Sequence, residues 1–300
     1  MKSAAYLDLH HSGELTRRKE AAWERLSHCD LCAHECRVNR NAGKQGVCRS
    51  VATVQISGYG PHFGEEAVLV GNGGSGTIFF SGCNLKCIFC QNWEISHWCE
   101  GNTVSTGELV DIMLELQERG CHNVNLVSPS HFVPQILAAL ETAVEKGLEL
   151  PLIFNAGGYE SLNTLRLLAG IIDIYMPDVK FGDAAIGMKL AGAKNYPEVV
   201  KEALKEMHRQ VGDLKVDPDG IARRGLLVRH LVLPGDLAGT EELVKFIAAE
   251  ISPNTYINIM DQYYPVYQAK QYPPLDRTLT VTEYETAKKI ARKAGLSRFA

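Results

Sequence analysis

Three cysteines lie close together in the segment SGCNLKCIFCQN: Cys83, Cys87 and Cys90. Thiolates are soft ligands, which bind iron–sulfur clusters or zinc in preference to hard cations. A cuboidal iron–sulfur cluster takes four cysteines, so three thiolates leave one iron free for a ligand that is not protein. Gly82 and Asn84 tolerate the tight backbone that such a loop needs. The spacing therefore predicts a cluster that orients and activates a small molecule.

The alternative for this loop is a zinc knuckle or a set of plain structural cysteines. Zinc sites usually complete four ligands, commonly with a paired C-x2-C motif or a histidine pair. The only nearby candidates are His97 and Cys99, which form neither pattern. We therefore favour the iron–sulfur cluster.

Four further cysteines form a second group near the N-terminus, Cys29, Cys32, Cys36 and Cys48. Four thiolates would close a site completely, and a closed site binds zinc or a cluster structurally or passes electrons. We favour a structural role in a small cysteine-bound lobe. His28 or His34 could replace one ligand, so the metal stays unassigned, and cysteines without metal remain an alternative. The isolated Cys99 and Cys121 are predicted to be small buried hydrophobes.

Composition places the chain among soluble globular proteins. Of its 300 residues, 45% are hydrophobic and 22% charged, which is ordinary for a folded domain. The net charge of -4 and the pI near 6.2 give no electrostatic reason to expect nucleic acid or an anionic membrane as a partner. We find no secretion signal and no long apolar run, so a cytoplasmic location is expected. In a reducing compartment, clustered cysteines indicate metal ligands before disulfides.

Apolar strand-like runs alternate with amphipathic helices from Thr77 onward, the pattern of repeated β/α units. Six strands are predicted, at Thr77–Ser81, Asn123–Val127, Leu152–Asn155, Ile171–Pro177, Leu226–Leu233 and Tyr256–Met260. The first predicted helix follows the capping candidates Ser105 and Thr106. The other predicted helices are Pro134–Lys146, Ser161–Leu168, Pro197–Val211, Glu241–Ile251 and Val281–Ala294. The simplest architecture is an α/β fold in which six units form an incomplete TIM-like barrel.

The pattern predicts three parts: a small cysteine-rich N-terminal lobe (1–76), a partial barrel (77–262) and a C-terminal flap with a helix (263–300). The runs VATVQIS and AVLVGN are predicted to be strands of the lobe. The glycine-rich GNGGSG that follows resembles a phosphate-binding loop only weakly, because no lysine and serine or threonine follow in Walker spacing. A flexible link between the lobe and the barrel explains it better.

Ligands of parallel α/β barrels gather at the carboxyl ends of the strands. Asn155 follows the third predicted strand, and Asp178 and Lys180 follow the fourth. Arg229 and His230 are consecutive in the fifth, so only one of them can face the interior. We favour Arg229, because its guanidinium suits a carboxylate. The alternatives are an ordinary surface salt bridge for Asp178 and Lys180, and local backbone hydrogen bonding for Asn155.

The spacing C-x3-C-x2-C, with Phe89 before the last cysteine, resembles the signature of the radical S-adenosylmethionine (SAM) superfamily. Together with FNAGGYES, YMPDVKFGD, VRHLVLPG and NIMDQYYP in that order, it looks most like the relatives of pyruvate formate-lyase activating enzyme. The resemblance covers nearly the whole chain. It implies a radical SAM fold of the incomplete (β/α)6 type and an oxidoreductase-like radical enzyme.

The resemblance also implies the cofactors and the site. Cys83, Cys87 and Cys90 would hold a [4Fe-4S] cluster whose fourth iron binds SAM, and an electron from a flavodoxin or ferredoxin would cleave SAM to a 5′-deoxyadenosyl radical. The substrate class suggested is a backbone glycine of a glycyl radical enzyme. The residues expected near SAM are Phe89, Asn92, Ser128, Ser130, His131, Asn155, Asp178, Lys180 and Arg229.

The turn after the second predicted strand departs from the family pattern. The superfamily commonly has a Gly-Gly-Glu run there that meets the amino group of SAM, whereas this chain has VSPSHFVP. Hydroxyl groups and an imidazole can also accept from an ammonium group. We expect Ser128, Ser130 and His131 to take over this role, or else to form a capped turn before Pro134.

Two other functions remain open at this point. The same cluster could serve a radical modification of another peptide or of a small molecule. The chain could instead be a non-catalytic iron–sulfur or zinc protein. Tyr263, Tyr264 and Tyr267 could line the substrate mouth, but we slightly favour a place in the core.

Overall fold

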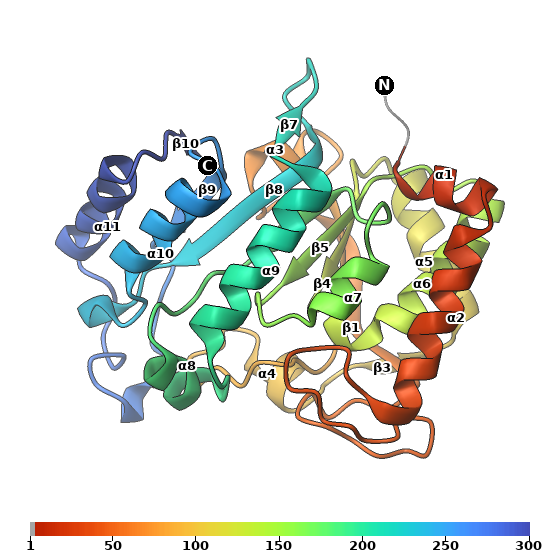
Figure 1. The fold of residues 1–300 in the computed structure, drawn as a ribbon, viewed down its shortest axis with the longest axis horizontal. Coiled ribbons are helices and arrows are strands. Elements are labelled where there is room, and N and C mark those ends of the chain that lie inside the picture. Colours follow the sequence, from red (N-terminus) through yellow and green to blue (C-terminus); the bar gives the residue numbers. More distant parts are fainter. Residues whose placement is uncertain (1–3) are drawn as a thin grey trace.

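The computed structural model describes residues 4–300, in which ten strands form one sheet flanked by helices (Figure 1). The strand order is β10-β9-β8-β6-β5-β4-β2-β1-β3, and β7 pairs with β8. The strands are β1 Val54–His62, β2 Ser75–Phe80, β3 Asn102–Val104, β4 Val124–Val127, β5 Leu152–Ala156, β6 Ile174–Pro177, β7 Lys215–Val216, β8 Ala222–Leu231, β9 Tyr256–Met260 and β10 Arg298–Phe299.

The six predicted strands are confirmed as β2, β4, β5, β6, β8 and β9, which pair in parallel in chain order. In register, Phe79 lies beside Val127, Val127 beside Asn155, and Asn155 beside Met176. Parallel strands need crossover connections, and helices supply them here. The result is the predicted incomplete barrel, with the carboxyl ends of the strands at one rim.

The predicted crossover helices are present as α5, α6, α7, α9 and α10, whereas α8 in the connection from β6 to β8 was not predicted. In α5, Ser105 and Glu108 form a capping box, in which each side chain satisfies the other's backbone N–H. The helices are α1 Tyr6–His11, α2 Glu14–Glu24, α3 Ala67–Val70, α4 Trp93–His97, α5 Thr106–Glu118, α6 Val133–Glu145, α7 Leu162–Leu167, α8 Ala184–Ala191, α9 Tyr196–Val211, α10 Thr240–Phe246 and α11 Val281–Lys293. No helix within residues 4–300 is long and apolar enough to cross a membrane.

The N-terminal residues contact the barrel closely. Helix α2 packs along α6, and β1 pairs antiparallel with β2, so it extends the same sheet (Figure 1). The Tyr6 hydroxyl donates a hydrogen bond to the carbonyl of Leu150 at 2.8 Å. The division of the chain into a lobe, a barrel and a flap stays a prediction.

Two local predictions for residues 67–76 are wrong. The run Ala67–Asn72 does not form a strand: Ala67–Val70 is the short helix α3, and Leu69 packs among interior side chains of the barrel. The glycine run is a packed turn and not a flexible link. A Cβ on Gly73 would collide with the carbonyl oxygen of Gly120, and one on Gly76 would lie 2.6 Å from the carbonyl oxygen of Asn123.

Asp173, just before β6, is expected to make stability depend on pH. Its buried carboxylate accepts from the backbone N–H of Ala5 at 3.0 Å and of Leu152 at 3.1 Å. Burial nevertheless raises the pKa of Asp173 to about 6. The folded protein therefore binds the Asp173 proton more tightly than the unfolded chain does. The stability that this proton contributes to the folded state is fully present below about pH 4 and is lost as pH rises through about 6.

The test is the midpoint of thermal unfolding of Asp173→Asn and of wild type between pH 5 and 7.5. Relative to the variant, wild type should lose stability across this range, by at most about 2 kcal/mol. The exposed Asp219→Asn is the matched control and should follow wild type. Parallel pH curves for wild type and Asp173→Asn would contradict the assignment.

Candidate active site at the carboxyl ends of the barrel strands

The three-cysteine loop begins where β2 ends and leads into α4. Hydrogen-bond donors approach two of its sulfurs: the Leu85 N–H lies 3.4 Å from Sγ of Cys83, and Ser96 Oγ lies 3.1 Å from Sγ of Cys90. Such donors stabilise negative charge on sulfur. These donors would stabilise the thiolate, the form in which cysteine binds metals, once a metal is bound.

Burial works against bare thiolates at this place. It raises the pKa of Cys83, and it raises the pKa of Cys87 to about 12, although the charge of Lys180 acts in the opposite direction. A buried charge is stable only when it is paired or binds a metal. These thiols and their donors fit a cationic metal centre.

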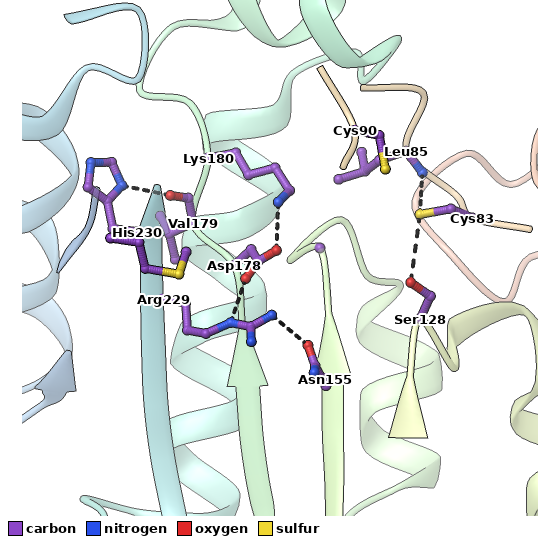
Figure 2. A network of polar contacts seen from close by, with 12 residues as sticks. Cys83, Leu85, Cys90, Ser128, Asn155, Asp178, Val179, Lys180, Arg229 and His230 are labelled. Carbon is purple, nitrogen blue, oxygen red and sulfur yellow. Dashed lines mark hydrogen bonds and ion pairs between the residues drawn. The ribbon is translucent and has the colours of Figure 1, made fainter. Parts of the chain in front are cut away.

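Ser128 is the residue of the unusual turn that reaches the cysteine loop. Its Oγ lies 4.0 Å from Sγ of Cys83, as Figure 2 shows. Its backbone φ is +56°, a conformation that glycine adopts freely and other residues rarely do. Ser128 therefore holds its hydroxyl beside Cys83 on a strained backbone.

Ser130 and His131 lie deeper in the same turn and are buried. Nε2 of His131 is 2.9 Å from the carbonyl oxygen of Ser81, and the His131 carbonyl accepts from Arg40. Burial and the Arg40 charge lower the pKa of His131 to about 3, so the ring is neutral. Contact with SAM stays a prediction for both residues.

Four predicted residues meet in one buried polar network (Figure 2). Asp178 accepts from Lys180 at 2.6 Å and from Nε of Arg229 at 2.9 Å. Nη2 of Arg229 also donates to Oδ1 of Asn155 at 2.9 Å. These side chains come from the ends of β5 and β6 and from β8, which are neighbours in the sheet, and Asp178 forms a β-bridge with Arg229. The alternative of an ordinary surface salt bridge does not describe them, since each is mostly buried.

Electrostatics keep this network ionised. Burial alone would raise the pKa of Asp178, but the charges of Arg229 and Lys180 outweigh it and lower the pKa to about 2. The same pairing raises the pKa of Arg229 and of Lys180 against the effect of burial. A fixed carboxylate with two fixed cations can therefore orient polar groups without changing protonation at ordinary pH.

Arg229 and His230 point to opposite sides of β8, as alternation predicts (Figure 2). His230 is completely buried, 2.7 Å from the Val179 carbonyl oxygen through Nδ1 and 2.9 Å from Oγ1 of Thr240 through Nε2. Burial lowers its pKa. His230 is a hydrogen-bonded packing residue, and Arg229 faces the interior.

Glu65 and Glu66 were not predicted to be near the site. Glu65 accepts from Asn125 on β4 at 3.3 Å and from Arg229 on β8 at 3.2 Å. Because β5 and β6 separate those two strands, Glu65 must lie across the concave face of the sheet. Asn258 on β9 donates to Glu66 at 2.9 Å. No local pattern in the sequence indicates that an acidic pair before a short helix enters a barrel.

Two oxygens of this acidic group are left without partners. Oε2 of Glu66 and Oδ1 of Asn125 are buried and accept no hydrogen bond from residues 4–300. Burial raises the pKa of Glu65, while the Arg229 charge lowers it. Three carboxyl groups, those of Glu65, Glu66 and Asp178, thus lie around Arg229, and one oxygen of Glu66 is free to accept a hydrogen bond.

The remaining predicted residues lie beside the loop. Phe89 is buried against Phe181 and Tyr263, with ring centroids 6.2 Å and 5.9 Å away. Asn92 is exposed and precedes α4. Tyr263 belongs to the core, and its hydroxyl donates to the Leu275 carbonyl at 2.6 Å. The roles of Phe89 and Asn92 toward SAM stay predictions.

Comparison with known proteins defines the class. The model of the radical SAM superfamily matches residues 77–247, so the chain belongs to the radical SAM superfamily. Membership implies a [4Fe-4S] cluster and SAM. The uncharacterized protein MJ0674 of Methanocaldococcus jannaschii is 34% identical over 290 residues, covering 94% of this chain and 79% of that protein.

Two solved structures are similar to this chain. The structure described as native anSMEcpe with bound AdoMet is 11% identical with a TM-score of 0.50, covering 73% of this chain and 61% of that one. Streptococcus suis SuiB bound to precursor peptide SuiA is 16% identical with a TM-score of 0.49, covering 73% and 46%. This chain thus spans less than two thirds of either protein.

Proposed function

We propose that this chain is a radical SAM enzyme that cleaves SAM reductively and uses the product radical to take hydrogen from a substrate. The observation that carries the proposal is the three-thiol loop, which ends the first parallel strand on the same rim as the Asp178–Arg229 network. Cys83, Cys87 and Cys90 would hold the [4Fe-4S] cluster. When bound, the cluster would supply the electron that breaks the C5′–S bond of SAM, which gives methionine and a 5′-deoxyadenosyl radical.

The side chains around the loop would bind and orient SAM. We assign the Asp178–Lys180–Arg229–Asn155 network to the polar groups of SAM, because its charges are fixed and its geometry is held from three strands. The Ser128 hydroxyl, beside Cys83, is assigned to the amino-acid end of SAM. The buried oxygens of Glu66 and Asn125 that have no partner favour a ligand with hydrogen-bond donors, and SAM carries an ammonium group.

The substrate class is proposed from the resemblance of the motifs. The order of FNAGGYES, YMPDVKFGD, VRHLVLPG and NIMDQYYP supports hydrogen abstraction from a backbone glycine of a partner enzyme. The alternative is radical modification of another peptide or of a small molecule, for which the free oxygens of Glu66 and Asn125 would accept from a donor on the substrate. A flavodoxin or ferredoxin is the expected electron donor.

The test is product analysis under anaerobic conditions. Reconstituted protein with dithionite and SAM should release 5′-deoxyadenosine and methionine in equal amounts. Release of neither product from protein with an intact cluster contradicts the radical function and favours a non-catalytic metal protein. An electron paramagnetic resonance doublet on a glycyl radical enzyme after mixing would support activation, and its absence with product formation would favour another substrate.

A further inference from the structure

The segment that contains the second group of cysteines has little regular secondary structure. Between Cys29 and β1 the chain forms neither a helix nor a paired strand, apart from a single bridge between Cys32 and Glu160. Its own apolar cluster contains three buried residues, Leu26, Cys29 and Leu31, with two partly buried neighbours. So small a core cannot by itself offset the conformational entropy of about 25 ordered residues.

The backbone of this segment is nevertheless held in unfavourable conformations. Glu35, Arg37 and Arg49 have φ values of +41°, +57° and +61°, in the left-handed region that side chains rarely adopt. Strained residues persist only where the surroundings over-determine them. A cross-link within the segment would supply that constraint.

The cysteines are placed to supply the cross-link. Cys29, Cys32 and Cys48 are buried, Cys36 is partly buried, and none of the four forms a disulfide. The Val47 N–H lies 3.5 Å from Sγ of Cys36, and a Cβ on Gly46 would lie 2.7 Å from the same sulfur. The chain wraps closely around this sulfur and donates to it, as at the sulfurs of the first loop.

We propose that Cys29, Cys32, Cys36 and Cys48 bind a second iron–sulfur cluster, closed by four thiolates. A cube bound by four thiolates has no open iron, so this cluster would be structural or pass electrons. The donor near Sγ of Cys36 resembles the donors near the sulfurs of Cys83 and Cys90 in the first loop. Zinc is the other metal that four thiolates can hold, and the experiment separates the two.

The second cluster would lie next to the first. The Cys48 carbonyl oxygen is 2.6 Å from where a Cβ on Gly82 would be, and Gly82 directly precedes Cys83. Nε2 of His34 is 2.7 Å from the Asn84 carbonyl oxygen, and Arg49 donates to the His97 carbonyl at 2.8 Å. The four-cysteine segment therefore packs directly against the loop that holds Cys83, Cys87 and Cys90.

The deciding experiment measures iron, sulfide and zinc in the Cys83→Ser/Cys87→Ser/Cys90→Ser variant, purified anaerobically and reconstituted. This variant keeps Cys29, Cys32, Cys36 and Cys48, so the proposed second site is unchanged in it. We expect about four iron and four sulfide per chain, against about eight of each in wild type. Reduced with dithionite, the variant should show an iron–sulfur paramagnetic signal, which zinc cannot give.

Two matched variants complete the test. Cys29→Ser/Cys32→Ser should also hold about four iron, and the lone-cysteine control Cys121→Ser should hold the wild-type content. About one zinc without sulfide in the triple variant, or no metal in a folded triple variant, overturns the proposal. These readouts need no SAM, so their failure is distinct from a failure of the proposed radical function.

Discussion

Cys87→Ala should abolish SAM cleavage, with the rates of 5′-deoxyadenosine and methionine formation falling by at least about three orders of magnitude, as expected when the redox centre itself is lost. Cys87 is the middle ligand of the loop and is buried. Its removal leaves two thiols, which cannot hold a cuboidal cluster. Quantifying both products by chromatography over time, in protein reconstituted as wild type is, measures the effect.

Cys121→Ala is the control for removal of a cysteine. Cys121 is also buried, but it precedes β4 at the amino end of the strand, at the rim opposite the cysteine loop. It should lose some stability through the smaller side chain and keep its rate of product formation. Normal product formation by Cys87→Ala would show that the loop is not the redox centre.

Arg229→Met should give the largest loss of stability among single substitutions of the network, about 3–5 kcal/mol. Methionine matches the length of arginine without its charge, so Asp178 and Glu65 would each lose a charged partner while staying buried. An uncompensated buried carboxylate costs far more than a lost surface pair. We expect weaker SAM binding as well, which equilibrium dialysis of SAM against the variant would detect.

Arg223→Met on the same strand is the matched control. Arg223 pairs with Asp217 near the surface, where an ion pair contributes about 0–1 kcal/mol. A second comparison is Arg229→Met/Asp178→Asn, which removes a charge from both sides and should recover part of the lost stability. Equal melting temperatures of Arg229→Met and Arg223→Met would refute the buried-network interpretation.

Local patterns in the sequence were sufficient to predict the parallel strands and most of the helices that connect them. Alternation along β8 correctly placed Arg229 and His230 on opposite faces, because the side-chain period of a strand is two whatever surrounds it. The capping box at Ser105 and Glu108 could be read directly, since its partners lie three residues apart. The cysteine loop also follows from spacing alone.

The run Ala67–Val70 shows where local patterns fail. A short apolar run fits a strand or a helix equally well, since it is too brief to show a period. Packing decides the outcome: Leu69 fills the interior beside Ile153 and Ile174, which come from strands far along the chain. The glycine turn before β2 was likewise decided by the backbone of Gly120, which leaves no room for a Cβ on Gly73.

The amino-acid sequence by itself determined the chemistry of this protein, because cluster ligands need only the right residue types within a short loop. Only the tertiary structure decided what surrounds that loop. Pairing of neighbouring strands places Asp178 beside Arg229, and the chain before α3 places Glu65 against Arg229 and Glu66 against Asn258. The contacts of Glu65 with Arg229 and of Glu66 with Asn258 join residues 164 and 192 positions apart, so no window of sequence could have specified them.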